Sequence, residues 1–239
     1  MSEQIITSLE EGAFEITLNN PAKLNCMGFE MLHALRESID DAEKNKAVKV
    51  IVFRGAGDRA FSTGANLKEF TSLDNKGNAE WIRLGHDIFN EIEKLSKPTI
   101  AFVNGYAMGG GLELALACDF RIGTASTIFC SAEMQNGWLP GWGGMVRLKR
   151  LLGLAKTKEL VLLSPKVDAQ EALKLGLITE IDDETNSSLK SMVTQLKGLN
   201  SNMVEMAKTV FRDDSWSTGE SDIQFDIEAA LIAKNLHSE

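Results

Sequence analysis

Hydrophobic positions up to about residue 130 recur with the two-residue period of strands in some segments and with the helical period in others. In residues 28–44, apolar side chains are spaced three or four positions apart, whereas the mainly β-branched run 48–53 is typical of a buried strand. The segments that we expect to be strands are 4–9, 13–18, 48–53 and 98–103, and the expected helices are 28–44 and 77–96. This alternation of strands and helices predicts an α/β fold.

After Pro140 the pattern becomes mostly helical, with little strand between the helices. The expected helices are 143–152, 154–164, 168–175, 184–198, 201–212 and 219–236. No linker, repeat or low-complexity segment divides the chain. We therefore expect an α/β core over residues 1–200, helical in its later part, and a helical C-terminal region over residues 201–239.

Length and charge narrow the classes of protein that this chain can belong to. Its 239 residues are enough to bury a sizeable core, in one large domain or two small ones. The formal net charge of −9, without any basic block, argues against nucleic acid or an anionic membrane as a partner. The N-terminal segment lacks the basic start and apolar run of a secretory signal, and no stretch reaches the roughly 18 apolar residues of a membrane span. We expect a cytoplasmic protein.

The residues that commonly hold metals or cofactors do not form a recognisable pattern. Cys26, Cys118 and Cys130 are odd in number and contain no CxxC pair, which argues against disulfides and zinc. The three histidines are scattered without metal-ligand spacing. Motifs for nucleotide binding and for a serine or cysteine nucleophile are missing as well. We expect neither a metal nor a separate cofactor.

A run of three glycines, Gly109 to Gly111, directly follows the expected strand 98–103 and begins an apolar helix. Glycines at such a place let the backbone approach a ligand, and N–H groups at a helix start favour negative charge. For the glycines alone, tight packing of strand against helix is the favoured explanation. Glu113 follows among apolar residues, where a carboxylate is costly to bury. It is a candidate catalytic acid or base, unless it faces outward or caps a turn.

Two further segments could contribute to the same site. The stretch 60–70, AFSTGANLKEF, follows the strand 48–53 as the glycine run follows 98–103, and loops at matching strand ends often share a pocket. Read alone, it is only a loop that leads into a short helix. The stretch 129–144 contains Glu133 and a Pro-Gly-Trp-Gly-Gly run that is typical of a turn into a helix. Glu133 alone would be an ordinary acid at a helix start.

Together these segments resemble the motifs of the crotonase (enoyl-CoA hydratase) superfamily. AFSTGANLKEF resembles its AF-x-AGAD-x-KE loop, and KPTIAFVNGYAMGGGLELALACDFRIGT resembles its glycine-rich ELAL-x-CD segment. FCSAEMQNGWLPGWGGMVRLKRLLG and NPAKLNCM resemble two more of its segments. The match extends from about residue 12 to about residue 180, and four motifs in the same order make a chance similarity improbable.

The resemblance implies a crotonase-like superhelix of ββα turns with a helical C-terminal region used in assembly. Trimers, or hexamers built as dimers of trimers, are the usual state of the family. The backbone N–H groups of Ala65 and Gly110 would form the oxyanion hole for a thioester carbonyl, and Glu113 and Glu133 would be the catalytic carboxylates. Contacts to the CoA and the acyl group would come from Lys23, Leu24, Ala65, Asn66, Leu67, Lys68 and Gly110.

Two glutamates beside an oxyanion hole are suited to adding water to a 2-enoyl-CoA, or to the reverse dehydration. The expected protein is therefore an enoyl-CoA hydratase, a hydro-lyase of acyl-CoA and fatty acid metabolism. Another crotonase activity (isomerase, thioester hydrolase, or hydration of a cyclic dienoyl-CoA) and a non-catalytic acyl-CoA-binding subunit are the alternatives. Turnover of crotonyl-CoA would separate the enzymes from the binder.

The sequence departs from the family pattern at several positions. Asn66 stands where an Asp is usual, Ala132 replaces a Pro, and Met145-Val146 replaces Thr-Gln. None of these removes a catalytic group, but the bulky Trp138 and Trp142 are expected to reshape the acyl pocket. The chain ends where many relatives continue into a last helix, which leaves open a natural short form or a truncated one.

Overall fold

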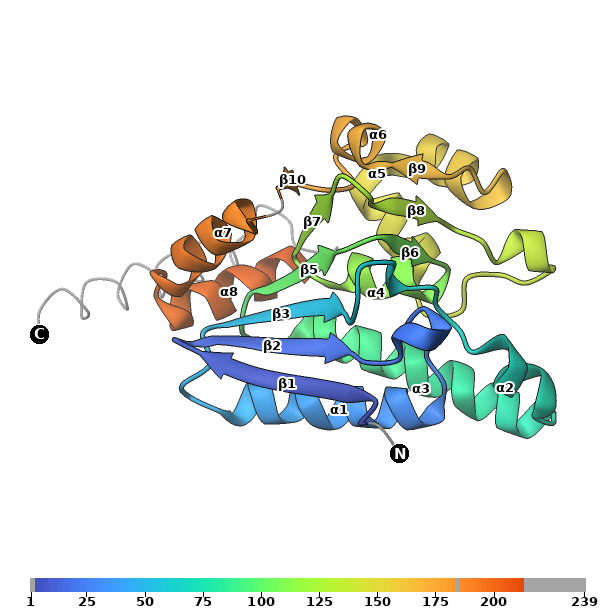
Figure 1. Ribbon diagram of the computed structural model, residues 1–239, viewed down its shortest axis with the longest axis horizontal. Coiled ribbons are helices and arrows are strands. Elements are labelled where there is room, and N and C mark those ends of the chain that lie inside the picture. The colour runs from blue at the N-terminus through green and yellow to red at the C-terminus, as the bar shows by residue number, and fades with distance from the viewer. Residues whose placement is uncertain (1–2, 184, 213–239) are drawn as a thin grey trace, which may run out of the picture.

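The strands of the computed structural model, which describes residues 3–183 and 185–212, form two sheets (Figure 1). The larger sheet has six strands in the order β1-β2-β3-β5-β7-β10. Its β1 (Ile5–Glu10) and β2 (Ala13–Leu18) pair in antiparallel fashion, and the other neighbours are parallel. The remaining strands are β3 (Val50–Gly55), β5 (Thr99–Val103), β7 (Phe120–Thr124) and β10 (Glu180–Asp182).

A second, four-stranded sheet has the order β4-β6-β8-β9. Its strands are β4 (Ala60–Ser62), β6 (Tyr106–Met108), β8 (Ile128–Cys130) and β9 (Val167–Asp168). The sequence analysis predicted a loop where β4 lies, which is wrong, and it gave no ranges for β6, β7, β8, β9 and β10. Strands of two or three residues are too short to show a two-residue period, so hydrophobic patterning does not reveal them.

The helices lie close to where the pattern predicts them. They are α1 (Phe29–Lys44), α2 (Leu67–Ser72), α3 (Asn75–Lys94), α4 (Gly110–Ala117), α5 (Gly144–Leu162), α6 (Ala169–Leu175), α7 (Ser187–Lys197) and α8 (Ser201–Arg212), with short 3-10 turns η1 (Pro21–Lys23) and η2 (Met134–Asn136). The two helices expected at 143–152 and 154–164 are confirmed as the two parts of α5, which are separated at Gly153, whose φ of 76° and ψ of 166° are not helical. The helix expected at 219–236 lies outside the described residues.

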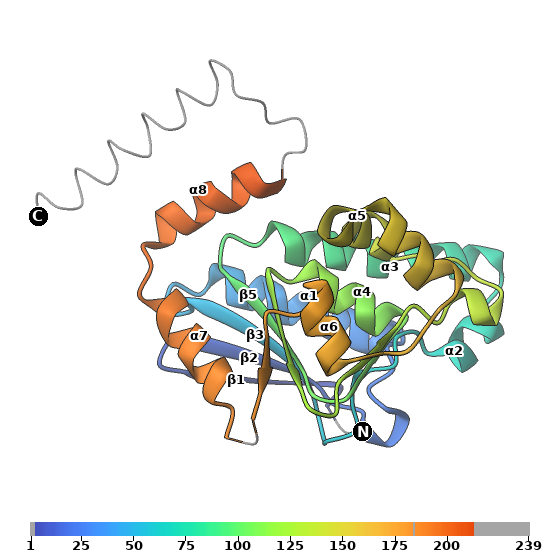
Figure 2. The same ribbon diagram turned by 90° about the horizontal axis from the view of Figure 1, so that it is seen from above.

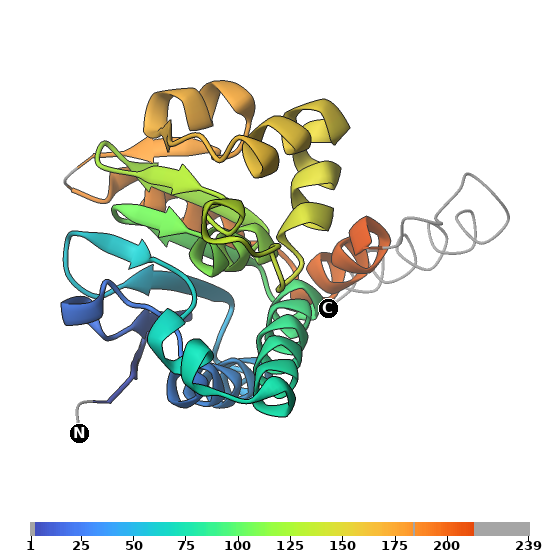
Figure 3. The ribbon, with the colours of Figure 1, turned by 90° about the vertical axis from the view of Figure 1, so that its right-hand side faces the viewer.

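The elements repeat in a fixed order, which confirms the expected ββα superhelix. Each of β3, β5 and β7 leads directly into a short strand of the second sheet, namely β4, β6 and β8, before the chain turns into helices. Figure 1 shows β6, β8 and β9 on the same side of the molecule as α2, and Figures 2 and 3 show the molecule from above and from that side. Within the described ranges, no helix is long and apolar enough to cross a membrane.

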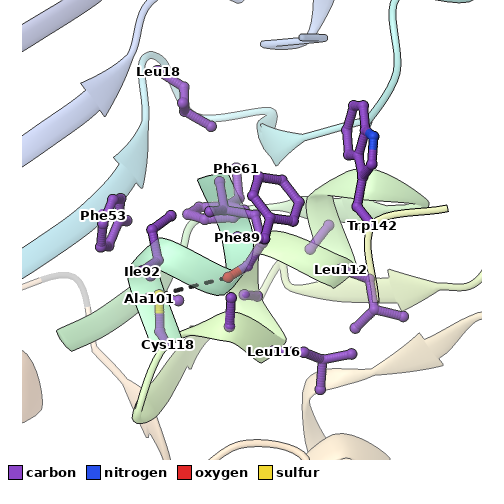
Figure 4. Close-up of a cluster of buried hydrophobic side chains, with 14 of the residues drawn as sticks. Leu18, Phe53, Phe61, Phe89, Ile92, Ala101, Leu112, Leu116, Cys118 and Trp142 are labelled. Carbon is purple, nitrogen blue, oxygen red and sulfur yellow. Dashed lines mark hydrogen bonds between the residues drawn. The ribbon is translucent and has the colours of Figure 1, made fainter. Parts of the chain in front are cut away.

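The larger sheet is covered on both faces, which explains why its central strands are apolar throughout. Alternate residues of β3, such as Ile51 and Phe53, pack into the main core with α1, α3 and α4. The residues between them, Val50 and Val52, pack under α7. Figure 4 shows the main core, in which Phe53 and Phe89 are fully buried and Trp142 is buried beside Phe89.

Two buried asparagines fix the loops that leave the sheet. Asn104, just after β5, accepts a hydrogen bond from Gly55 N (3.1 Å) and donates to the carbonyls of Gly55 (2.8 Å) and Gly57 (2.7 Å). Asn25 donates to the carbonyl of Ala60 at 2.7 Å. Because buried backbone carbonyls need donors, these side chains hold the turns between the two sheets in one arrangement.

Candidate active site

Four of the residues predicted from sequence line one cavity of about 410 Å³: Ala65, Gly110, Glu113 and Glu133. They come from the loop after β4, the start of α4, the first turn of α4, and the loop after β8. The rest of the wall is apolar and largely aromatic. The expected convergence of loops from matching strand ends is therefore confirmed.

The backbone around Ala65 directs its N–H group away from the neighbouring chain. Met27 and Ala65 form a parallel β-bridge in which Met27 N donates to Gly64 O (2.7 Å) and Asn66 N donates to Met27 O (2.8 Å). Since N–H directions alternate along an extended chain, the N–H of Ala65 points to the opposite side. Nothing in the described part of the chain accepts a hydrogen bond from it.

Gly110 supplies a second N–H group in the same place. It is the first residue of α4, and the first N–H groups of a helix have no partner inside the helix. The two loops touch closely: a Cβ on Gly64 would lie 2.6 Å from Gly110 N and 2.7 Å from Met108 O. Gly64 also has φ +84°, so a glycine is required there both by conformation and by space. This contact sets the spacing of the two N–H groups.

Glu113 is buried in α4, with 4% of its surface exposed. Its Oε1 accepts hydrogen bonds from the backbone N–H groups of Trp142 (2.9 Å) and Gly144 (2.8 Å). Both donors belong to the Pro-Gly-Trp-Gly-Gly turn, so this turn holds the carboxylate in place. No donor in the described ranges bonds to Oε2, which leaves that oxygen available for proton transfer.

Glu133 approaches the cavity from the loop after β8. Its Oε2 accepts a hydrogen bond from Ser131 Oγ at 3.0 Å. Its Oε1 is buried and has no hydrogen-bond partner among the described residues. A buried oxygen without a donor is costly, and such groups in native proteins usually serve a ligand or a reaction. Gly109 lies next to this oxygen: a Cβ there would be 3.4 Å from it, at ordinary van der Waals contact.

The electrostatics of the cavity make both carboxyl groups easier to protonate. Burial, together with the charge of Glu133, raises the pKa of Glu113 to about 7, although the Trp142 and Gly144 N–H groups oppose the shift. Burial also raises the pKa of Glu133, against the effect of its hydrogen bonds. A carboxyl group with a pKa near neutrality can donate or accept a proton with comparable ease.

Arg147 fixes the turn that holds Glu113. It is buried on α5 and donates to Trp142 O (2.7 Å), Asn90 Oδ1 (2.7 Å) and Glu93 Oε2 (2.9 Å). Trp142 is thus held at its carbonyl by Arg147 and at its N–H by Glu113. Sequence reasoning did not select Arg147, because an arginine in an amphipathic helix gives no signal of its own.

Sequence reasoning also missed Ser131 and the two backbone N–H donors, of Trp142 and Gly144, in the Pro-Gly-Trp-Gly-Gly turn. Ser131 lies two residues before Glu133 and is buried, and its hydroxyl orients the carboxylate. The turn residues matter through their N–H groups, which every residue except proline has. The one sequence signal for these two donors is the glycine at position 144. A larger residue does not fit there, because its Cβ would lie 2.7 Å from Glu113 Cγ.

The other predicted site residues lie beside the cavity rather than in its wall. Lys23 is exposed on η1, and the carbonyl of Leu24 accepts a hydrogen bond from Thr63 N at 3.0 Å, next to the Ala65 loop. Asn66 is the N-cap of α2, and Leu67 and Lys68 are exposed in its first turn. These five residues thus border the loop that carries Ala65.

Comparison with known proteins identifies the family. The model of the enoyl-CoA hydratase/isomerase family matches residues 8–238. A short-chain-enoyl-CoA hydratase of Clostridium acetobutylicum is 34% identical over 177 residues, covering 74% of this chain and 68% of the relative. A crotonyl-CoA hydratase of Syntrophomonas wolfei is 35% identical over 179 residues, covering 75% and 69%. The chain belongs to the enoyl-CoA hydratase/isomerase family, whose members act on acyl-CoA thioesters.

Solved structures agree on the fold. The enoyl-CoA hydratase from Thermoplasma volcanium superposes with a TM-score of 0.88 at 31% identity, covering 100% of this chain and 94% of that one. The enoyl-CoA hydratase from Bacillus anthracis superposes with a TM-score of 0.88 at 28% identity, covering 95% and 89%. The crotonase-like fold expected from the motifs is confirmed.

Proposed function

We propose that this protein is an enoyl-CoA hydratase, which adds water to the double bond of a 2-enoyl-CoA thioester or removes it from a 3-hydroxyacyl-CoA. The observation that carries the proposal is the pair Glu113 and Glu133. Each has one carboxylate oxygen without a protein donor in the described ranges, and both line one apolar cavity. The names of the relatives support the same reaction.

The N–H groups of Ala65 and Gly110 suit the thioester carbonyl. When water adds to the β-carbon, negative charge develops on this oxygen as an enolate, and two fixed donors stabilise that charge more than the starting carbonyl. The position of Gly110 at the start of α4 adds a favourable helix dipole. Because the surrounding wall is apolar, the donors act where little water screens them.

The two glutamates would then handle one water molecule. One carboxylate takes a proton from the water as its oxygen bonds to the β-carbon, and the other carboxyl group supplies a proton to the α-carbon. The β-carbon gains the hydroxyl group and the α-carbon gains a proton, which together make up one water. The reaction therefore needs no oxidant, metal or separate cofactor. A pKa of about 7 at Glu113 fits a group that changes protonation state in each turnover.

We further propose that the CoA portion lies along the loops that border the cavity. Lys23 and Leu24 would meet the adenine, and Asn66, Leu67 and Lys68 would line the entrance for the pantetheine and acyl groups. Their support is the proximity of both segments to Ala65: Leu24 is hydrogen-bonded to Thr63, and Asn66 directly follows Ala65.

Assembly as a homotrimer or hexamer is proposed as well. Its support is apolar surface on the helices late in the chain: Leu154, Leu162 and Leu163 of the α5 region are 53%, 59% and 73% exposed, and Phe211 of α8 is 80% exposed. A contiguous patch of exposed apolar side chains commonly marks an interface, and we propose that these residues contribute to one. Light scattering at micromolar concentration tests this, and a stable monomer would contradict it.

Loss of the conjugated thioester absorbance of crotonyl-CoA, with product identification, tests the reaction. Chelator-treated enzyme is expected to form 3-hydroxybutyryl-CoA at an undiminished rate. Glu113→Gln and Glu133→Gln keep the size of each side chain and should each lower kcat by about 10²–10⁴. Failure to turn over short, medium and cyclic enoyl-CoAs would overturn the proposal. A shifted double bond in the product would favour the isomerase alternative instead.

A further inference from the structure

Five aromatic rings form a continuous series from the cavity into the core. The order is Trp138, Phe70, Trp81, Trp142 and Phe89, with neighbouring centroids 4.8 to 5.2 Å apart and the rings inclined by 45° to 77°. The first four line the cavity, whereas Phe89 is fully buried behind Trp142. Rings at such distances and angles attract each other beyond their burial, so the series forms a stiff wall.

Trp142 occupies a slot made by two glycines. A Cβ on Gly85 of α3 would overlap Cε2 and Nε1 of its indole ring, and a Cβ on Gly110 would overlap Cζ3 and Cε3. The ring therefore lies in direct contact with the backbone of α3 on one side and of the proposed oxyanion hole on the other. Only 3% of Trp142 is exposed, and Figure 4 shows it beside Phe89 in the core.

We propose that the indole ring of Trp142 closes the inner end of the acyl pocket and makes the enzyme specific for CoA thioesters with short, compact acyl groups. This inference rests on the proposed hydratase function. A thioester carbonyl bound at Ala65 and Gly110 has its α- and β-carbons near Glu113 and Glu133. The rest of the acyl group then meets the aromatic wall, of which Trp142 is the member in contact with the oxyanion loop.

The role of the ring is separable from the role of the Trp142 backbone. Its N–H holds Glu113 and its carbonyl accepts from Arg147, and both contacts are available to any residue that can donate an N–H. A smaller side chain keeps these bonds and opens space toward Gly85 and α3. The ring can therefore be changed without removing the hydrogen bonds that hold Glu113, which makes the inference testable.

The test compares kcat/KM for 2-octenoyl-CoA with kcat/KM for crotonyl-CoA in each variant. The ratio cancels any general loss of catalysis caused by looser packing around Gly110. Trp142→Ala is expected to raise the ratio by roughly tenfold or more, and Trp142→Phe by less, because added methylenes gain apolar contacts once the space exists. An unchanged ratio in a folded Trp142→Ala enzyme that still hydrates crotonyl-CoA would overturn the inference.

Gly85→Ala gives an independent test that does not replace Trp142 itself. Alanine is the better helix former, so this change would by itself stabilise α3, and any loss must come from its overlap with the ring. The displaced ring should narrow the pocket and lower the same ratio, by about tenfold. A ratio that stays constant or rises would contradict the proposal. If the wild-type protein hydrates neither substrate, the proposed function fails; if it hydrates crotonyl-CoA and only the ratios fail to move, this inference alone fails.

Discussion

Asn66 and Glu69 are joined by two hydrogen bonds across the first turn of α2. Asn66 Oδ1 accepts from Glu69 N at 3.4 Å, and Asn66 Nδ2 donates to Glu69 Oε2 at 3.1 Å. The other carboxylate oxygen of Glu69 accepts from Phe29 N at 3.0 Å, at the start of α1. One side-chain pair thus caps two helices, and it does so directly after Ala65, the proposed oxyanion donor.

Removing this cap should loosen Ala65. Asn66→Ala is expected to cost about 1 kcal/mol of stability, as the loss of an N-cap usually does, and to lower kcat/KM by about fivefold if α2 frays. Asn66→Ser is the control: serine keeps an N-cap acceptor without adding a second carboxylate beside Glu69, so it should stay closer to wild type. Thermal unfolding and steady-state kinetics with crotonyl-CoA check both. Equal losses in the two variants would show that the cap does not position Ala65.

Gly64→Ala should damage catalysis more than folding. The new Cβ would lie 2.6 Å from Gly110 N, so the two N–H donors must move apart. A displaced oxyanion donor is expected to lower kcat by about 10²–10³. Gly176→Ala is the control, because Gly176 has a similar φ of +75° but no heavy atom within 4 Å of an added Cβ. If both variants lost activity equally, backbone strain rather than donor spacing would be the cause.

The two glutamates are expected to act as one unit. If they share one water, the double variant Glu113→Gln/Glu133→Gln should be little slower than the worse single variant, rather than showing the product of both losses. Single-turnover rates with crotonyl-CoA measure this, and circular dichroism checks that all three variants fold. Near-normal activity of Glu133→Gln would contradict a catalytic role for that residue.

Stability should depend on pH through Glu113. Burial and the nearby Glu133 raise the pKa of Glu113 to about 7 in the folded protein, whereas a glutamate in the unfolded chain titrates near 4.3. The stabilisation by the retained proton is full below about pH 4.3 and is lost as the pH rises through about 7. The free energy of unfolding should fall by roughly 3 kcal/mol over this range.

Urea unfolding at several values between about pH 5 and pH 8 tests this expectation. Glu113→Gln cannot titrate, so its midpoint should fall less with rising pH and should exceed that of the wild type near pH 8. The Gln oxygen still accepts from Trp142 and Gly144, which keeps the turn in place. Parallel pH profiles in the two proteins would mean that Glu113 does not titrate in this range.

The sequence alone determined the α/β class, most of the helices and the family. In helices such as α1 and α3, one face packs on the core. Their apolar residues therefore recur every three or four positions, and this period can be read directly from the sequence. Three glycine- and glutamate-containing motifs selected Ala65, Gly110, Glu113 and Glu133 before any geometry was known. Their presence in one cavity followed from the rule that loops at matching strand ends meet.

Only the tertiary structure decided how those residues are held. The short strands of the second sheet are stabilised by pairing with segments that are distant in the sequence. The two or three residues of each strand therefore give no local signal of the sheet. The donors to Glu113 are backbone N–H groups of Trp142 and Gly144, which no side-chain pattern encodes. The slot for the Trp142 ring is formed by Gly110 and by Gly85, which lies 57 positions before Trp142 in the sequence. Such contacts arise between segments that meet only when the chain is folded, and for that reason the sequence could not show them.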